Sequence, residues 1–177
     1  MPNTAYLEHY TVDDYVHWEG NWELIYGAPY AMSPSPSITH QRVAKRFLVQ
    51  LDAQLKECPL CEVLSEVDWH CAEDIIVRPD IVLVCDVKGE HLVETPELII
   101  EVVSPSTVKR DEQIKRVLYQ EKGVKNYILV YPQEHKVVIY QLVEGRYEQV
   151  RGKKEEIFDF QVQHCTIELA FDQIWQG

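Results

Sequence analysis

The sequence has no long apolar run. None of its segments reaches the roughly 18 apolar residues that a transmembrane helix needs. Its first ten residues also lack the basic start and the apolar stretch of a secretory signal. We therefore expect a cytoplasmic protein that does not interact with a membrane.

Basic residues are scarce as well. The chain has 17 Lys and Arg against 29 Asp and Glu, which gives a formal net charge of -12. Avid non-specific binding of nucleic acid depends on neutralising phosphates with Lys and Arg, so this balance argues against it. An enzyme that cuts DNA can still use a local basic face and metal ions, so the distribution of charge decides the question.

Cysteines are few and odd in number: Cys58, Cys61, Cys71, Cys85 and Cys165. A chain of this size in a reducing compartment does not need disulfides. The C-x-x-C spacing of Cys58 and Cys61 is that of half a zinc site, but the second half would have to come from His70 and Cys71, whose spacing does not fit. The pattern favours thiols beside a turn at a helix end, with zinc as the alternative.

The remaining pattern predicts one α/β domain over residues 1–177, with a core from about 10 to 175. Two main helices, 37–57 and 104–122, are expected to flank a mixed sheet, and a short helix begins near Thr11. The expected strands are 22–26, 29–32, 62–69, 81–84, 98–100, 127–131, 136–143, 147–150 and one more in the tail, before a last short helical piece.

Two carboxylates stand where burial should exclude them. Glu101 lies inside the apolar run 98–103, and Asp80 heads the apolar run 81–84. An unpaired buried carboxylate is strongly unfavourable. An antiparallel pairing with Asp80 opposite Glu101 and Val84 opposite Glu97 would place both acids on the same face, where a divalent cation would relieve their repulsion. The competing interpretation pairs Glu101 with Arg78 or Lys115 and lets Asp80 cap a turn.

The helix after Glu101 can point further groups at the same place. Asp111, Lys115 and Tyr119 follow one another at intervals of four residues, which places them on one stripe, and residues 109–122 are locally basic. Ile114, Val117 and Leu118 should face inward beside them. The alternative for the stripe is an exposed Asp–Lys pair beside a half-buried tyrosine.

Several strings together resemble a known family. They are Arg78-Pro79-Asp80-Ile81, the run from Ile100 to Thr107, Asp111, Lys115, Tyr119 and Gly123-Val124, preceded by Trp22 to Gly27, Met32 to Pro36 and His40. This pattern is similar to the "putative restriction endonuclease" family within the PD-(D/E)xK nuclease superfamily, over roughly residues 10 to 175.

The resemblance implies the restriction-endonuclease-like fold and an endonuclease that cleaves phosphodiester bonds with Mg²⁺, or with Mn²⁺, acting on DNA rather than RNA. It makes Asp80 and Glu101 the metal-binding and catalytic acids. The family's lysine would stand at position 103, where this chain has Val103, so Lys115 is the expected replacement.

The same resemblance marks supporting residues. Glu23 is similar to an additional acid near the site, and His40 matches a position of the family without an assigned role. Asp111 would steer Lys115 or touch a water on the metal, and Tyr119 would pack in the helix with its hydroxyl near the site.

Two other functions compete with the nuclease. A non-catalytic binding or regulatory module of the same fold is the main alternative, favoured by the acidic surface and by Val103. A glycosidase would need its two carboxylates on opposite sides of a sugar cleft, which the expected strand pair does not provide. A homodimer is expected because cutting both strands of a duplex needs two sites.

Overall fold

A six-stranded sheet forms the centre of the protein. We describe it from a computed structural model, for residues 7–150 and 157–176. Its strands, in spatial order, are β10 (Arg146–Gln149), β9 (Lys136–Val143), β8 (Asn126–Tyr131), β7 (Leu98–Val102), β6 (Ile81–Cys85) and β3 (Cys61–Ser65). The neighbours β7 and β8 are parallel and the other pairs antiparallel, so the expected mixed sheet is confirmed.

The register of β6 against β7 is the one expected from the sequence. Ile81 lies opposite Ile100, and Leu83 opposite Leu98. Continued by one residue, this pairing sets Asp80 opposite Glu101. Both strands are buried along their whole length, because helices cover both faces of the sheet.

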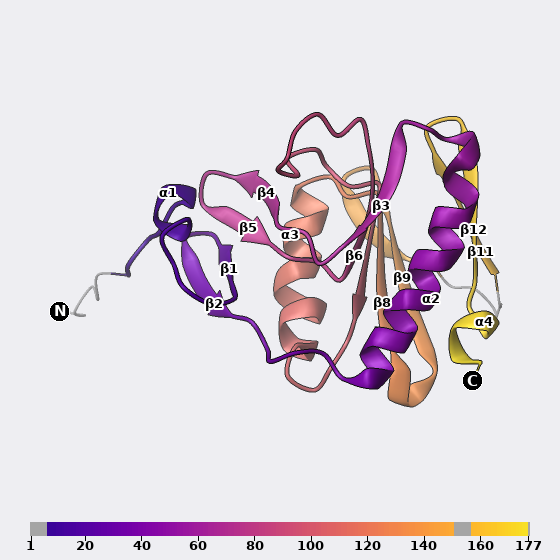
Figure 1. The fold of residues 1–177 in the computed structure, drawn as a ribbon, viewed down its shortest axis with the longest axis horizontal. Helices are drawn as coiled ribbons and strands as arrows, with labels where there is room; N and C mark the ends of the chain where they lie inside the picture. Colours follow the sequence, from indigo (N-terminus) through magenta and orange to yellow (C-terminus); the bar gives the residue numbers. More distant parts are fainter. Residues whose placement is uncertain (1–6, 151–156, 177) are drawn as a thin grey trace.

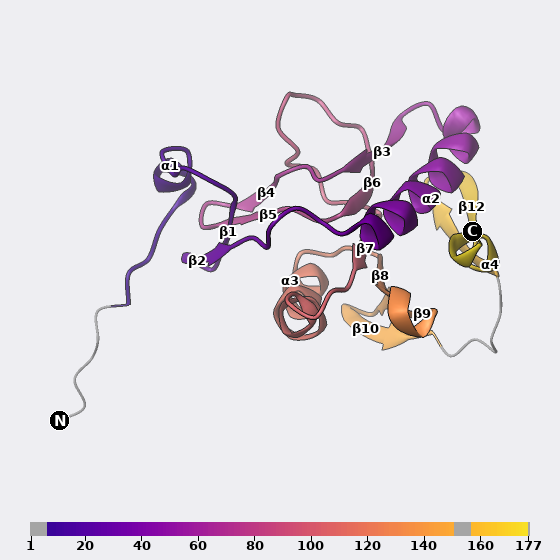
Figure 2. The ribbon, with the colours of Figure 1, turned by 60° about the horizontal axis from the view of Figure 1, so that its bottom comes forward.

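The two main helices cover opposite faces of this sheet (Figures 1 and 2). Helix α2 (Ile38–Gln54) is capped by the Ser37 side chain and continues into the short helix η1 (Leu55–Glu57). It buries Val43, Phe47 and Leu51 in one apolar cluster. Helix α3 (Arg116–Glu121) buries Leu118 and Tyr119 in the other cluster, with alternate residues of the same strands.

The second helix is not the regular helix that was expected over 104–122. Residues 105–107 form a turn, Val108 and Lys109 a first short stretch of helix, and Arg110–Lys115 the π-helix η2; only then does α3 begin. The wider turn of η2 shifts the phase of α3, and Val117 is 45% exposed instead of facing inward. The Tyr127 hydroxyl donates to the backbone oxygen of Asp111 at 2.9 Å and so anchors η2 to the sheet.

A smaller sheet, of order β2-β1-β5-β4, lies beside the first. Its strands are β1 (Trp22–Ile25), β2 (Ala28–Ala31), β4 (Trp69–Ala72) and β5 (Ile75–Val77), and helix α1 (Val12–Tyr15) precedes it. The hairpin β1–β2 was expected, and its turn contains Gly27 at a φ of +74°, where an added Cβ would also collide with the His9 ring. The expectation of one strand over 62–69 was wrong, since the chain leaves β3 at Glu66 (φ 51°) and enters the second sheet at Trp69.

The C-terminal part is a hairpin rather than the single strand that was expected. Strand β11 (Ile157–Val162) pairs with β12 (Cys165–Ala170), and helix α4 (Asp172–Trp175) comes after them. Alternate residues of both strands are buried in the cluster that contains α2. The short helix η3 (Pro132–Glu134) connects β8 to β9.

The cysteines also differ from expectation. The structure joins Cys58 to Cys165 and Cys61 to Cys85 as disulfides, and leaves Cys71 free. Cys61 and Cys85 are opposite one another in β3 and β6, and the C-terminal hairpin carries Cys165 to the end of η1. Free thiols were therefore the wrong expectation for these four cysteines. Nothing in the sequence indicated the pairing, because the partners are 24 and 107 residues apart.

The described helices include none that is long and apolar enough to cross a membrane.

Candidate active site

The structure brings Asp80 and Glu101 side by side at one end of β6 and β7. The backbone N–H of Asp80 donates to Glu101 Oε2 at 3.3 Å, and the N–H of Val102 donates to Asp80 Oδ2 at 2.7 Å. Among the described residues, no hydrogen bond reaches the second oxygen of Asp80, Oδ1. The pair is thus fixed by the strand register and keeps one carboxylate oxygen available.

Lys115 extends from η2 into a group of carboxylates. Its Nζ lies 2.8 Å from Glu23 Oε1, 3.0 Å from Glu101 Oε1 and 3.9 Å from Asp111 Oδ1. Burial alone would lower the pKa of Lys115, but Glu101, Glu23 and Asp111 together raise it above its ordinary value. Asp111 and Lys115 are both buried, so the exposed Asp–Lys pair is excluded, and Lys115 is a permanent cation.

The carboxylates around Lys115 carry more negative charge than its single ammonium neutralises. Burial raises the pKa of Glu101 well above its ordinary value, Lys115 opposes this rise, and Asp111 and Asp80 add to it. Burial likewise raises the pKa of Asp111. The pairing of Glu101 with Lys115 that was expected as an alternative is therefore present, yet it leaves the ionised site short of positive charge.

Glu23 connects the smaller sheet to this site. It stands on β1 and is 1% exposed. It accepts hydrogen bonds from the backbone N–H of Arg78 (2.9 Å) and from Nη1 of Arg110 (3.2 Å), besides its contact with Lys115. The smaller sheet thus supplies an acid that holds Lys115 in place.

His40 and Tyr119 each touch one of the two strand carboxylates. His40 is on the first turn of α2, and its Nε2 lies 3.1 Å from Asp80 Oδ2. Burial would lower the pKa of His40, but the hydrogen bond to Asp80 and its charge raise it overall. The Tyr119 hydroxyl donates to Glu101 Oε1 at 2.9 Å, so its hydroxyl lies at the site, as expected.

A cavity of about 800 Å³ opens over these side chains. Two serine- and proline-rich loops form part of its wall, and they meet where Ser33 Oγ and Ser106 Oγ lie 2.9 Å apart. Arg78, Arg110 and Glu66 also line it, and Arg110 and Glu66 were not predicted as residues of the site. Arg78 was expected as a possible partner of Glu101, but its guanidinium pairs with Asp68 instead. Arg110 belonged to the recognised basic segment, whereas Glu66 carried no sequence signal.

The donor set suits a hard cation. Mg²⁺ and Mn²⁺ prefer oxygen ligands, and Mg²⁺ is usually held by one or two carboxylates, with water and phosphate oxygens completing an octahedron. Asp80 and Glu101 offer such a pair, and the raised pKa of Glu101 means that added positive charge would be favourable there. Among the described residues, a compact group of three possible metal ligands lies away from this site. It consists of Cys58, His164 and Cys165.

A mixed sheet with two acids on adjacent strands, and a lysine from the following helix, defines a restriction-endonuclease-like protein. The fold is similar to a crystal structure described as "a putative nuclease belonging to DUF820 from Anabaena variabilis". The TM-score is 0.75 at 17% sequence identity, over 94% of this chain and 97% of that one.

The family model described as "Putative restriction endonuclease" (Uma2) matches residues 12–169. The chain belongs to this family, as the resemblance of its motifs implied, and this membership supports a nuclease. A search of curated proteins finds no match.

Proposed function

We propose that the protein is an endonuclease that hydrolyses phosphodiester bonds of DNA with the help of Mg²⁺, held by Asp80 and Glu101. The observation that carries this proposal is the convergence of these two acids with the Lys115 ammonium, 3.0 Å from Glu101, in one cavity. Mn²⁺ is expected to substitute, because it prefers the same oxygen ligands.

The cation would polarise the scissile phosphate and lower the pKa of a bound water. Lys115 acts beside it as a fixed charge. Its raised pKa keeps it protonated at neutral pH, so its role is to stabilise negative charge on the reacting phosphate rather than to accept a proton. Val103 occupies the position of the family's lysine, and Lys115 supplies the ammonium from the helix.

The remaining residues position this machinery. Glu23 and Asp111 hold the ammonium of Lys115 between them, Tyr119 orients Glu101 through its hydroxyl, and His40 orients Asp80. A carboxylate held by such hydrogen bonds presents its free oxygen in a fixed direction, as a metal ligand requires.

The cavity contains groups that can bind phosphate, although the chain as a whole is acidic. Arg78 and Arg110 line the cavity, together with the serine hydroxyls of both loops. Arginine and hydroxyl groups are common phosphate contacts, so the cavity is suited to a nucleic-acid backbone although the net charge of the chain is -12. The preference for DNA over RNA rests on the family, and the homodimer stays a prediction.

Cleavage of supercoiled plasmid tests the proposal. Wild-type protein is expected to nick or linearise plasmid in Mg²⁺ or Mn²⁺ and to be inactive in EDTA. Asp80→Asn and Glu101→Gln should lose activity by at least about 100-fold, equivalent to about 2.7 kcal/mol of transition-state stabilisation. Glu62→Gln, an exposed acid on β3, is the matched control and should cleave like wild type.

Calorimetric titration with Mg²⁺ separates metal binding from turnover. Binding that Asp80→Asn removes is expected, and equal heats for wild type and variant would exclude Asp80 as a ligand. Cleavage that persists in Glu101→Gln would refute the catalytic assignment. Metal and DNA binding without any cleavage would instead assign the chain to the non-catalytic binding modules.

A further inference from the structure

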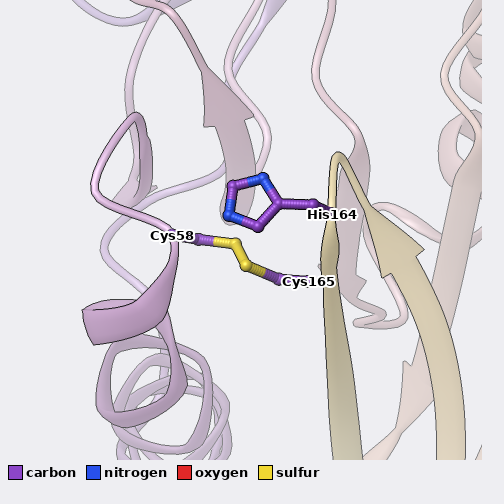
Figure 3. Close-up of side chains that lie close together, drawn as sticks. All are labelled: Cys58, His164 and Cys165. Atoms are coloured by element: carbon purple, nitrogen blue, oxygen red, sulfur yellow. A yellow bond between two sulfur atoms is a disulfide. The ribbon is translucent and has the colours of Figure 1, made fainter.

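A second group of potential metal ligands lies away from the carboxylates. Cys58 follows η1 at the end of α2, His164 lies in the turn between β11 and β12, and Cys165 is the first residue of β12. The sulfur atoms of Cys58 and Cys165 are joined, and the His164 imidazole lies beside them (Figure 3). The two sulfurs and one ring nitrogen of His164 all lie within 4.8 Å of one another.

We propose that the reduced protein binds one Zn²⁺ at this place, through Cys58 Sγ, Cys165 Sγ and a ring nitrogen of His164. Thiolate sulfur and imidazole nitrogen are the ligands that zinc prefers, and two cysteines with one histidine form a known three-ligand set. Of the two cysteines in the C-x-x-C spacing only Cys58 takes part, because Cys61 is paired with Cys85. The other ligands are His164 and Cys165 instead of His70 and Cys71.

The backbone already has the separation that such a site needs. Two thiolates on a tetrahedral zinc ion lie about 3.8 Å apart, given Zn–S distances of about 2.3 Å. The Cα atoms of Cys58 and Cys165 are 6.3 Å apart, which allows this sulfur separation by rotation of the side chains alone. Each strand or helix end can therefore keep its place.

The surroundings give access and a fourth ligand. Cys58 is buried, but His164 is exposed and, with Cys165 and Glu57, lines a cavity of about 540 Å³. Water from this cavity can occupy the fourth coordination position. The cavity is separate from the one that contains Asp80 and Glu101, so the inference does not depend on the proposed nuclease.

The disulfide and the zinc site exclude one another. A thiol or phosphine reductant delivers two electrons to the Cys58–Cys165 bond, and with two protons this yields two thiols. Each thiol releases its proton when it binds Zn²⁺. Both forms would fasten the C-terminal hairpin to α2, where Gln50 and Gln54 already bond to the backbone of β12.

Cobalt substitution tests the proposal. The full chain is reduced with a phosphine, freed of metal with a chelator that is then removed, and titrated with Co²⁺. We expect the sulfur-to-cobalt charge-transfer absorption and the intense visible bands of a tetrahedral thiolate site to reach their maximum at one thiolate-bound Co²⁺ per chain. Co²⁺ held by the carboxylate oxygens of the other site gives no charge-transfer band from sulfur. Zn²⁺ should displace the Co²⁺ and remove both signals.

The variants assign the ligands. Cys165→Ser should abolish the thiolate signal, and His164→Ala, at an exposed position that the fold does not need, should weaken Co²⁺ binding more than tenfold. Cys71→Ser, the free cysteine, should behave like wild type, as should Asp80→Asn, which removes a ligand of the other site. Circular dichroism of each variant checks that it is folded.

Two results would overturn the inference. The first is a fully reduced wild type without a sulfur-to-cobalt band, which would mean that the pair forms a disulfide only. The second is a band that survives Cys165→Ser or His164→Ala unchanged but disappears in Cys61→Ser. That outcome would place the metal on the other cysteine pair.

Discussion

Replacing Glu101 with Gln should make the metal-free protein more stable while it stops cleavage. Burial raises the pKa of Glu101 above its ordinary 4.5, so the folded state holds a proton that the unfolded chain has released. The wild type therefore loses stability as the pH rises from about 4.5 through the raised pKa. Glutamine has no proton to lose, so the advantage of the variant should grow over this pH range.

The size of the effect can be worked out from the neighbours of Glu101. Ionising Glu101 in the folded protein is unfavourable, because burial, Asp111 and Asp80 all oppose its negative charge. Gln keeps an acceptor for Lys115 and Tyr119, and Lys115 retains Glu23 at 2.8 Å, so the ammonium stays paired. The variant gives up only the weak bond from the Asp80 N–H, at 3.3 Å. We expect a net gain of about 1–2 kcal/mol at pH 8, or about 2–8 °C in melting temperature.

Urea unfolding at pH 5 and pH 8, each in EDTA and in 10 mM MgCl₂, measures this gain. With a metal dissociation constant of about 1 mM, Mg²⁺ should stabilise the wild type by about 1.4 kcal/mol and leave Glu101→Gln unchanged. The gap at pH 8 should then close. A variant less stable than wild type at pH 8 in EDTA, or equally stabilised by Mg²⁺, would refute the reasoning. Glu62→Gln serves again as control.

Three further changes probe the supports of the site. Lys115→Met leaves Glu23 and Glu101 without their shared cation; we expect a loss of about 3–5 kcal/mol in urea unfolding and no cleavage, and a stable variant would contradict this. His40→Gln, measured in EDTA, should lower the free energy of unfolding most below pH 6.5, because His40 is fully protonated there and its contact with Asp80 contributes in full. The loss should become smaller as the pH rises through the raised pKa of His40. A difference that does not depend on pH would count against the Asp80 contact. Tyr127→Phe should cost about 1–2 kcal/mol and speed amide hydrogen exchange in η2, unless its hydroxyl bond is dispensable.

The strand carboxylates were predictable because strand register is set by strand ends. A charged residue within an apolar run is easily noticed in a sequence. The pairing that matches the ends of 81–84 and 98–100 sets Asp80 opposite Glu101, and the structure has the same register. The predicted helix over 37–57 located α2 in the same way, since the 3.6-residue spacing of apolar side chains is a local property.

The predictions that failed depended on contacts between distant segments. Nothing local distinguishes a strand that stays in one sheet from one that leaves it at Glu66 for another. Strands β4 and β5 of the smaller sheet were missed for that reason. The π-helix η2 was missed because helical spacing was extended from Ser104 without knowledge of the Tyr127 hydroxyl, which bonds to a residue 16 positions away in sequence. The disulfide partners of Cys58 and Cys61 were hidden similarly.

The packing around Val103 explains why the lysine of the site stands at position 115 and not at position 103. Val103 directly follows β7, two residues after Glu101, and is buried in the apolar cluster that contains Leu118 and Tyr119. Val103 also lines the cavity beside Glu101, where the Lys115 ammonium already lies 3.0 Å from Glu101 Oε1, so a second ammonium at position 103 would be repelled by the first. Lys115, carried by η2, reaches the same face where Glu23 and Glu101 both face it. The smaller sheet, which contributes Glu23, is therefore what allows the ammonium to come from the helix.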